Sequence, residues 1–93
     1  MICGGIQSAD PNNESANEAI KLAILQHNEK QNDNLEFVKV TELTSQVVAG
    51  SRFRATVECL KDGVTKPYFI DIWCKPGPDY PKNFEVQKFE PKE

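Results

Sequence analysis

The sequence predicts an α+β fold in which a single long helix is wrapped by a curved, four- to five-stranded antiparallel sheet. Apolar residues recur at helical spacing in only one stretch, near the N-terminus, and the rest of the chain is rich in alternating β-branched and aromatic residues. The connections between the later strands are too short for parallel crossovers. With 93 residues, the chain is expected to form a single domain, 1–93.

The predicted helix follows an N-terminal segment without periodicity. Residues 1–13 contain glycines, a proline and several asparagines, so we expect a flexible arm there. Ser15 followed by Glu18 is a capping-box pattern, which predicts the start of the helix. The polar run 32–34 predicts its end, because short polar side chains compete for the backbone. The residues expected on its buried face are Ala16, Ile20, Ala23, Ile24 and His27, with Leu22 and Leu25 beside them.

After the helix, the pattern is that of strands joined by turns. Within 35–48 the apolar positions change parity between Val40 and Leu43, which predicts a bulge. Gly50 and the pair Asp62-Gly63 predict tight turns. The predicted strands are 35–48, 52–59, 68–75 and 84–89.

No set of residues in the sequence points to catalysis. His27 is the one histidine, and no local signature provides it with a nucleophilic partner. The carboxylates are scattered, no glycine-rich loop joins a strand to a helix, and no spacing suits a metal. We therefore expect no enzymatic activity, no cofactor and no metal.

Charge and hydropathy narrow the expected partners. The net charge is −3, and the basic residues form no stripe with aromatics, so no nucleic acid is expected as a partner. The apolar residues before the first glycines are too few for a membrane span or a secretory leader. These observations predict a cytoplasmic protein that binds no membrane.

The cysteines fit a reducing compartment. Cys3, Cys59 and Cys74 cannot all pair within one chain, and their spacing matches no zinc or redox motif. Cys59 and Cys74 fall in predicted strands, where they are expected to be buried free thiols. Cys3 falls in the predicted arm and is expected to be exposed.

Three segments are apolar or glycine-rich although they lie at a chain end or at turns. They are Ile2-Cys3-Gly4-Gly5, Gln46-Val47-Val48-Ala49-Gly50 and Lys75-Pro76-Gly77-Pro78. A single exposed apolar residue is common, but three such segments on one small domain indicate a surface for a partner.

These segments resemble the cystatin family. Gln46-Val47-Val48-Ala49-Gly50 is similar to the QxVxG signature of cystatins, and Ile2-Cys3-Gly4-Gly5 is similar to the start of the stefins, the intracellular type 1 branch. The helix and its exit, from Leu22-Ala23 to Asn34-Leu35-Glu36-Phe37, resemble those of plant cystatins. The resemblance covers essentially the whole chain in order and spacing.

The resemblance implies a cystatin-like fold and a reversible, competitive, tight-binding inhibitor of papain-like, cathepsin-type cysteine proteases. In the family, an N-terminal arm and two hairpin loops occupy the active-site cleft of the protease. Carried over to this chain, Gly4 or Gly5 is the glycine of the arm, and Ile2 and Cys3 fill the S3 and S2 subsites. The two loops are then formed by Gln46, Val47, Val48, Ala49 and Gly50, and by Pro76 and Gly77. The alternative is a non-inhibitory binding module with the same fold.

The chain departs from the family pattern in its second loop. Lys75-Pro76-Gly77 has no leucine or tryptophan at its tip, and we expect Trp73 to be a strand residue. This loop is therefore expected to bury less apolar surface than usual. Asn32, at the place of a legumain-binding loop in some cystatins, is interpreted as a residue that ends the helix. The resemblance also implies a monomer that can form a domain-swapped dimer through the turn after Val48.

Overall fold

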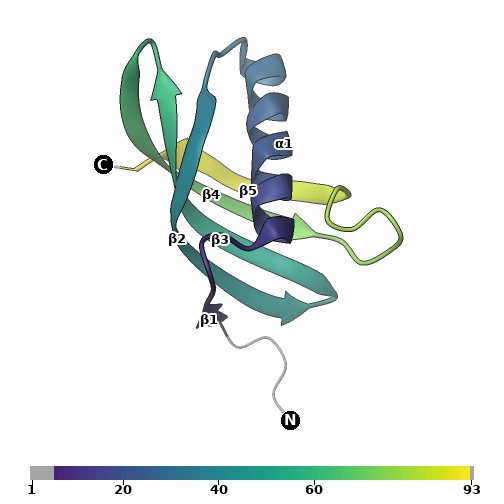
Figure 1. Ribbon diagram of the computed structural model, residues 1–93. Coiled ribbons are helices and arrows are strands. Elements are labelled where there is room, and N and C mark those ends of the chain that lie inside the picture. The colour runs from purple at the N-terminus through teal and green to yellow at the C-terminus, as the bar shows by residue number, and fades with distance from the viewer. Residues whose placement is uncertain (1–5, 93) are drawn as a thin grey trace.

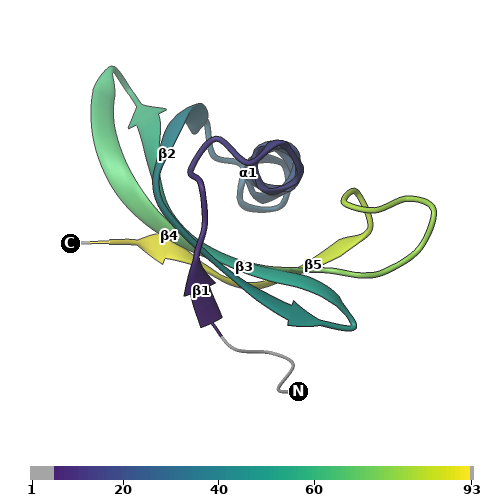
Figure 2. The same ribbon diagram turned by 60° about the horizontal axis from the view of Figure 1, so that its bottom comes forward.

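The computed structural model describes residues 6–92, and its fold confirms the predicted α+β class. One helix lies in the concave side of a five-stranded antiparallel sheet of order β1-β2-β3-β4-β5 (Figure 1; Figure 2). Among the described residues, no helix has the length and hydropathy to cross a membrane. The elements are β1 (Ile6–Ser8), α1 (Glu14–Gln31), β2 (Glu36–Val48), β3 (Gly50–Lys61), β4 (Val64–Cys74) and β5 (Phe84–Pro91).

Helix α1 begins earlier than the capping-box pattern predicts. Asn13 is the N-cap, and its side-chain oxygen accepts a hydrogen bond from the Ala16 N–H at 2.9 Å. Ser15 therefore lies inside the first turn, and the prediction of a capping box at Ser15 and Glu18 is wrong. The predicted end is confirmed: Asn32 takes the left-handed conformation, with a φ of 53°, and its N–H bonds to the Asn28 carbonyl.

Small residues on α1 let the helix approach the sheet closely. Three of the buried helix residues are alanines, and the two buried isoleucines beside them, Ile20 and Ile24, contribute about 1.5–3 kcal/mol each. The prediction that Leu25 widens the buried stripe is wrong, because 60% of its surface is exposed. The buried helix residues are Ala16, Ala19, Ile20, Ala23 and Ile24; the strand residues facing them include Val57, Cys59, Ile70, Ile72 and Cys74.

The curvature of the sheet is concentrated in β2. The pairing of β2 with β3 shifts register between Phe37 and Lys39 and again between Val40 and Glu42. These irregularities confirm the bulge that the parity change predicts, and they bend β2 so that the sheet wraps α1 (Figure 2).

A short strand lies inside the segment predicted as a flexible arm. In β1, Ile6 pairs with Gln46 and Ser8 pairs with Thr44 on the outer edge of β2. Three residues carry too little pattern to be recognised as a strand, and the free hydrogen-bonding groups of the edge of β2 order them. The rest of the predicted arm before β1, residues 1–5, lies outside the described part of the chain.

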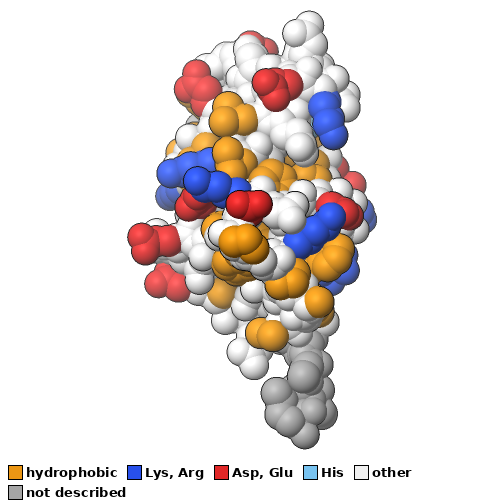
Figure 3. All heavy atoms as spheres, turned by 90° about the vertical axis from the view of Figure 1, so that its right-hand side faces the viewer, with side chains coloured by type: hydrophobic (Ala, Val, Ile, Leu, Met, Phe, Trp, Pro, Cys, Tyr) orange, Lys and Arg blue, Asp and Glu red, His pale blue; other side chains and the backbone are white. Residues whose placement is uncertain are grey.

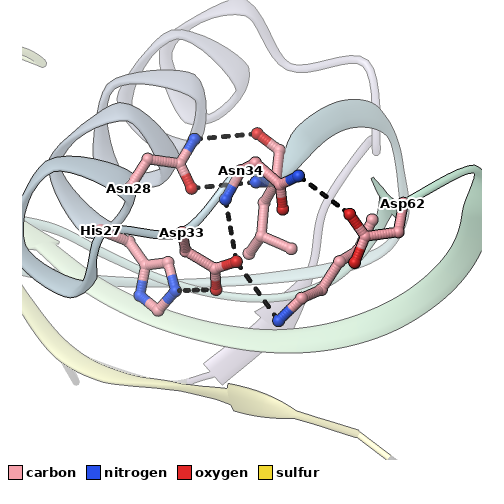
Figure 4. Close-up of polar contacts among 7 residues, drawn as sticks. His27, Asn28, Asp33, Asn34 and Asp62 are labelled. Carbon is pink, nitrogen blue, oxygen red and sulfur yellow. Dashed lines mark hydrogen bonds and ion pairs between the residues drawn. The ribbon is translucent and has the colours of Figure 1, made fainter.

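Polar contacts tie the exit of the helix to the β3–β4 hairpin (Figure 4). Asp33 lies 3.0 Å from His27 Nε2 and 3.2 Å from Lys61 Nζ, measured to its carboxylate oxygens. Its carboxylate also accepts from the Asn34 N–H at 2.8 Å. The backbone N–H of Asn34, then His27 and Lys61, lower the pKa of Asp33 from 3.8 to about 2.

The low pKa of Asp33 predicts how stability depends on pH. Because its folded pKa lies below its ordinary value, the carboxylate stabilises the fold above about pH 4, and this contribution is lost as the pH falls toward 2. Asp33→Asn should therefore lower the midpoint of urea unfolding at pH 7. The difference in midpoint between this variant and the parent chain should become smaller on acidification. Asp79→Asn, in the exposed β4–β5 connection, is the control. A difference in midpoint that stays constant between pH 7 and pH 3 would contradict the stabilising role of the Asp33 carboxylate.

Candidate functional site

The hairpin between β2 and β3 presents an apolar tip. Val48 pairs with Gly50, so Ala49 alone forms the turn. Val47 is 66% exposed and Val48 is 39% exposed. Exposed valines at a tight turn have no core to pack against, which is typical of a surface that binds a partner.

Gly50 brings this hairpin into contact with the β4–β5 loop, residues 75–83. Its φ is +87°, in the left-handed region that favours glycine. A Cβ at this position would overlap the carbonyl oxygen of Cys74 and would lie 3.0 Å from Pro76 Cδ. Only a glycine allows the two backbones to lie this close together.

The β4–β5 loop is ordered by its own backbone hydrogen bonds. The Lys75 N–H donates to the Asn83 carbonyl at 2.8 Å, which closes the base of the loop, and the Tyr80 N–H donates to Gly77 at 3.1 Å. Pro76 and Gly77 are exposed, and a Cβ at Gly77 would meet nothing within 4 Å. The structure thus places Pro76 and Gly77 on an open part of the loop.

The chain enters the sheet beside the same hairpin. Ile6, the first described residue, is 58% exposed and pairs with Gln46. In both ribbon views β1, the β2–β3 hairpin and the β4–β5 loop lie toward one end, and the β3–β4 hairpin lies toward the other (Figure 1; Figure 2). We call the surface formed by Ile6, 46–50 and 76–77 the binding edge. The predicted site residues Ile2, Cys3, Gly4 and Gly5 lie outside the described residues.

Hydrophobic side chains gather on the face that carries the loop and the hairpin. Figure 3 shows them from the middle of this face to its lower part, and a few more above, with lysine, arginine and carboxylate side chains between them. Gln46, at the base of the hairpin, accepts a hydrogen bond from Arg54 at 3.3 Å. The tip is thus apolar, and polar contacts begin at its base.

Sequence reasoning missed two residues next to the binding edge. Trp73 is a strand residue, as predicted, but its indole N–H donates to the Ala49 carbonyl at 2.7 Å. The Tyr80 hydroxyl donates to Ser51 Oγ at 3.0 Å. The parity of β4 points Trp73 away from the core, and an outward tryptophan near a turn was the available signal.

The described residues offer contact surface and no reactive centre. Cys59 and Cys74 are buried free thiols, and burial raises the pKa of each to about 11, so they stay protonated at neutral pH. The carboxylate of Asp71, buried in β4, is held by Arg52 through two hydrogen bonds of 3.0 and 2.8 Å. Within 6–92, no group of His, Cys, Asp and Glu side chains could hold a metal ion.

The described residues thus combine one helix, a five-stranded antiparallel sheet and an apolar edge at the β2–β3 hairpin. The family model described as "Cystatin domain" matches residues 4–75. The chain belongs to the cystatin family.

The relatives include plant proteins. Over 74 residues the chain is 40% identical to "Cysteine proteinase inhibitor A" of Helianthus annuus, a match that covers 80% of this chain and 87% of the sunflower protein. It is 36% identical over 90 residues to "Cysteine proteinase inhibitor 12" of Oryza sativa subsp. japonica. That match covers 95% of this chain but spans 35% of the longer rice protein.

The fold is also that of a solved structure. A salivary cystatin from the soft tick Ornithodoros moubata matches with a TM-score of 0.75, over 99% of this chain and 100% of the tick chain. The two sequences are 20% identical, so this likeness supports the fold alone.

Gly50→Ala should destabilise the chain more than Gly63→Ala does. Gly63 has a similar φ of +81°, but a Cβ there would meet nothing within 4 Å. The control therefore carries only the backbone strain, about 1–2 kcal/mol. The overlap with Cys74 should add about 1–3 kcal/mol for Gly50→Ala, as overpacking does. Urea unfolding of both variants measures the difference. Equal losses of unfolding free energy would show that the close approach of Gly50 to Cys74 leaves room for a Cβ.

Proposed function

We propose that this chain is a reversible, competitive, tight-binding inhibitor of papain-like cysteine proteases. The observation that carries the proposal is the contact at Gly50. It joins the apolar tip of the β2–β3 hairpin, the first hairpin of the binding edge, to the β4–β5 loop that contains Pro76 and Gly77. Membership of the cystatin family supports it, as do the plant relatives that are named cysteine proteinase inhibitors.

The shape of the binding edge suits the occlusion of a cleft. Val47, Val48 and Ala49 are compact and exposed, so a groove that accepts them removes apolar surface from water. Each valine that becomes fully buried contributes about 1.5–3 kcal/mol. β-branched side chains lose little rotamer entropy on binding, and a preformed hairpin needs little rearrangement. The turn fills the cleft with side chains and a tight loop, so the proposed inhibition requires no cleavage of the inhibitor.

The N-terminal segment extends this proposal. Ile6 pairs with Gln46, which anchors the chain beside the first hairpin. Ile2 and Cys3 are proposed to enter the non-primed subsites, and Gly4 or Gly5 to allow close approach to the protease wall.

Three finer assignments belong to the same proposal. The free buried thiols of Cys59 and Cys74 are compatible with a cytoplasmic protein of the stefin type. Cathepsin-type enzymes are the proposed targets. We also propose that the chain is a monomer that can exchange segments through the turn at Ala49 to give a domain-swapped dimer.

Titration of papain with the purified chain should abolish activity at about one inhibitor per enzyme. Val47→Asp should weaken inhibition by at least about 100-fold, because it removes apolar burial and brings an unpaired charge into the cleft. Val64→Asp is the matched control, since Val64 is 53% exposed at the opposite hairpin. It should inhibit like the parent chain.

Two outcomes would contradict the proposal. If several papain-like enzymes keep full activity at micromolar inhibitor, the chain is a binding module with a cystatin fold. If Val64→Asp weakens inhibition as much as Val47→Asp does, the contact surface lies elsewhere.

A further inference from the structure

The end of β4 and the β4–β5 loop contact the β2–β3 hairpin at the two residues that flank Gly50. On one side, Trp73 Nε1 donates to the Ala49 carbonyl at 2.7 Å. On the other, the Tyr80 hydroxyl donates to Ser51 Oγ at 3.0 Å. Both bonds join residues more than 20 positions apart in the chain, separated by 24 and 29 residues respectively, so they are tertiary contacts.

The indole of Trp73 is itself held in place from β5. Lys75 Nζ lies 5.6 Å from the centroid of the Trp73 ring, within the range of a cation–π interaction. The same ammonium lies 2.6 Å from a carboxylate oxygen of Glu85. A series of contacts therefore runs from Glu85 through Lys75 and Trp73 to the turn at Ala49.

Tyr80 is positioned by the loop. Its backbone N–H donates to the Gly77 carbonyl, and the next residue, Pro81, is buried. The Tyr80 hydroxyl reaches back to Ser51, the second residue of β3, so the contacts of Trp73 and Tyr80 lie on either side of Gly50.

The hairpin needs external support because its tip has none of its own. Val47, Val48 and Ala49 are all exposed, so no core packing fixes the turn. A turn that samples several conformations binds with an affinity reduced by the fraction of time it spends in the competent one. Contacts that hold the competent conformation remove this loss.

We infer that Trp73 and Tyr80 are positioning residues, which hold the first hairpin in the conformation that enters the protease cleft. Trp73 at the end of β4 and Tyr80 in the β4–β5 loop then act together as a brace for the β2–β3 hairpin. This inference rests on the proposed function, since the hairpin is taken as the protease-contacting element.

Trp73→Phe and Tyr80→Phe remove one hydrogen bond each and keep an aromatic ring. Each should raise the dissociation constant for papain by about three- to tenfold, the range expected for one hydrogen bond. Most of the change should lie in the association rate, because the competent hairpin becomes less populated. In the free protein, amide hydrogen exchange at 49–51 should become faster.

Asn34→Ala is the matched control. It removes the 3.0 Å hydrogen bond to Asp62 at the opposite hairpin, and it should change neither the association rate nor exchange at 49–51. In a chain that also carries Val47→Ala and Val48→Ala, Trp73→Phe should change the affinity by less than about twofold. The hairpin tip then contributes little to binding, so its position matters less. An effect on overall stability alone would have the same size in both backgrounds.

The inference is overturned if both phenylalanine variants bind papain like the parent chain and exchange at 49–51 is unchanged. It is also overturned if the effect of Trp73→Phe is undiminished in the alanine background. If the parent chain fails to inhibit papain, the proposed function fails, and exchange at 49–51 still decides whether Trp73 and Tyr80 hold the hairpin.

Discussion

The backbone of β3 passes the end of β4 so closely that residue 50 has no room for a side chain. A Cβ on Gly50 would overlap the Cys74 carbonyl oxygen and press on Pro76. This approach brings the β2–β3 turn and the β4–β5 loop together, and it places Ala49 within reach of the Trp73 indole. Without it, the apolar tip would be an isolated hairpin, and Pro76 and Gly77 would not share a surface with it.

The rest of the fold supports the sheet that carries that contact. Alanines at 16, 19 and 23 let the helix lie close in the concave side of the sheet, and the bulges in β2 bend the sheet around it. The polar contacts of Asp33 with His27 and Lys61 fasten the other end of the helix. The binding edge therefore projects from a scaffold that is secured at its far end, which suits a surface that binds with little rearrangement.

Local patterns predicted the helix and the four long strands, because each depends on a periodicity read within its own residues. β1 was missed because Ile6–Ser8 forms a strand only through pairing with β2. The helix start was misplaced because Asn13 and Ser15 are both good caps, and the sequence alone does not say which side chain meets the free N–H.

The site was predictable in its parts but not in its assembly. The apolar and glycine-rich character of 46–50 marked the first hairpin, and the prolines marked the second loop. Their contact depends on the register of β3 with β4, which pairs Ser51 with Cys74. The brace is still less visible in the sequence, since Trp73 and Tyr80 reach their acceptors only once the sheet has formed.

The central claim is that one edge of the molecule, assembled around Gly50, meets the protease. Its most direct test is to map the backbone NMR shifts of the chain as it is titrated with papain whose active-site thiol is blocked by a small group. We expect the perturbed amides to be those of Ile6, 46–51, Gly77, Asp79 and Tyr80, with 62–63 and the helix exit unchanged. Shifts centred on the β3–β4 hairpin or on the outer face of the sheet, with 46–51 unperturbed, would contradict the account.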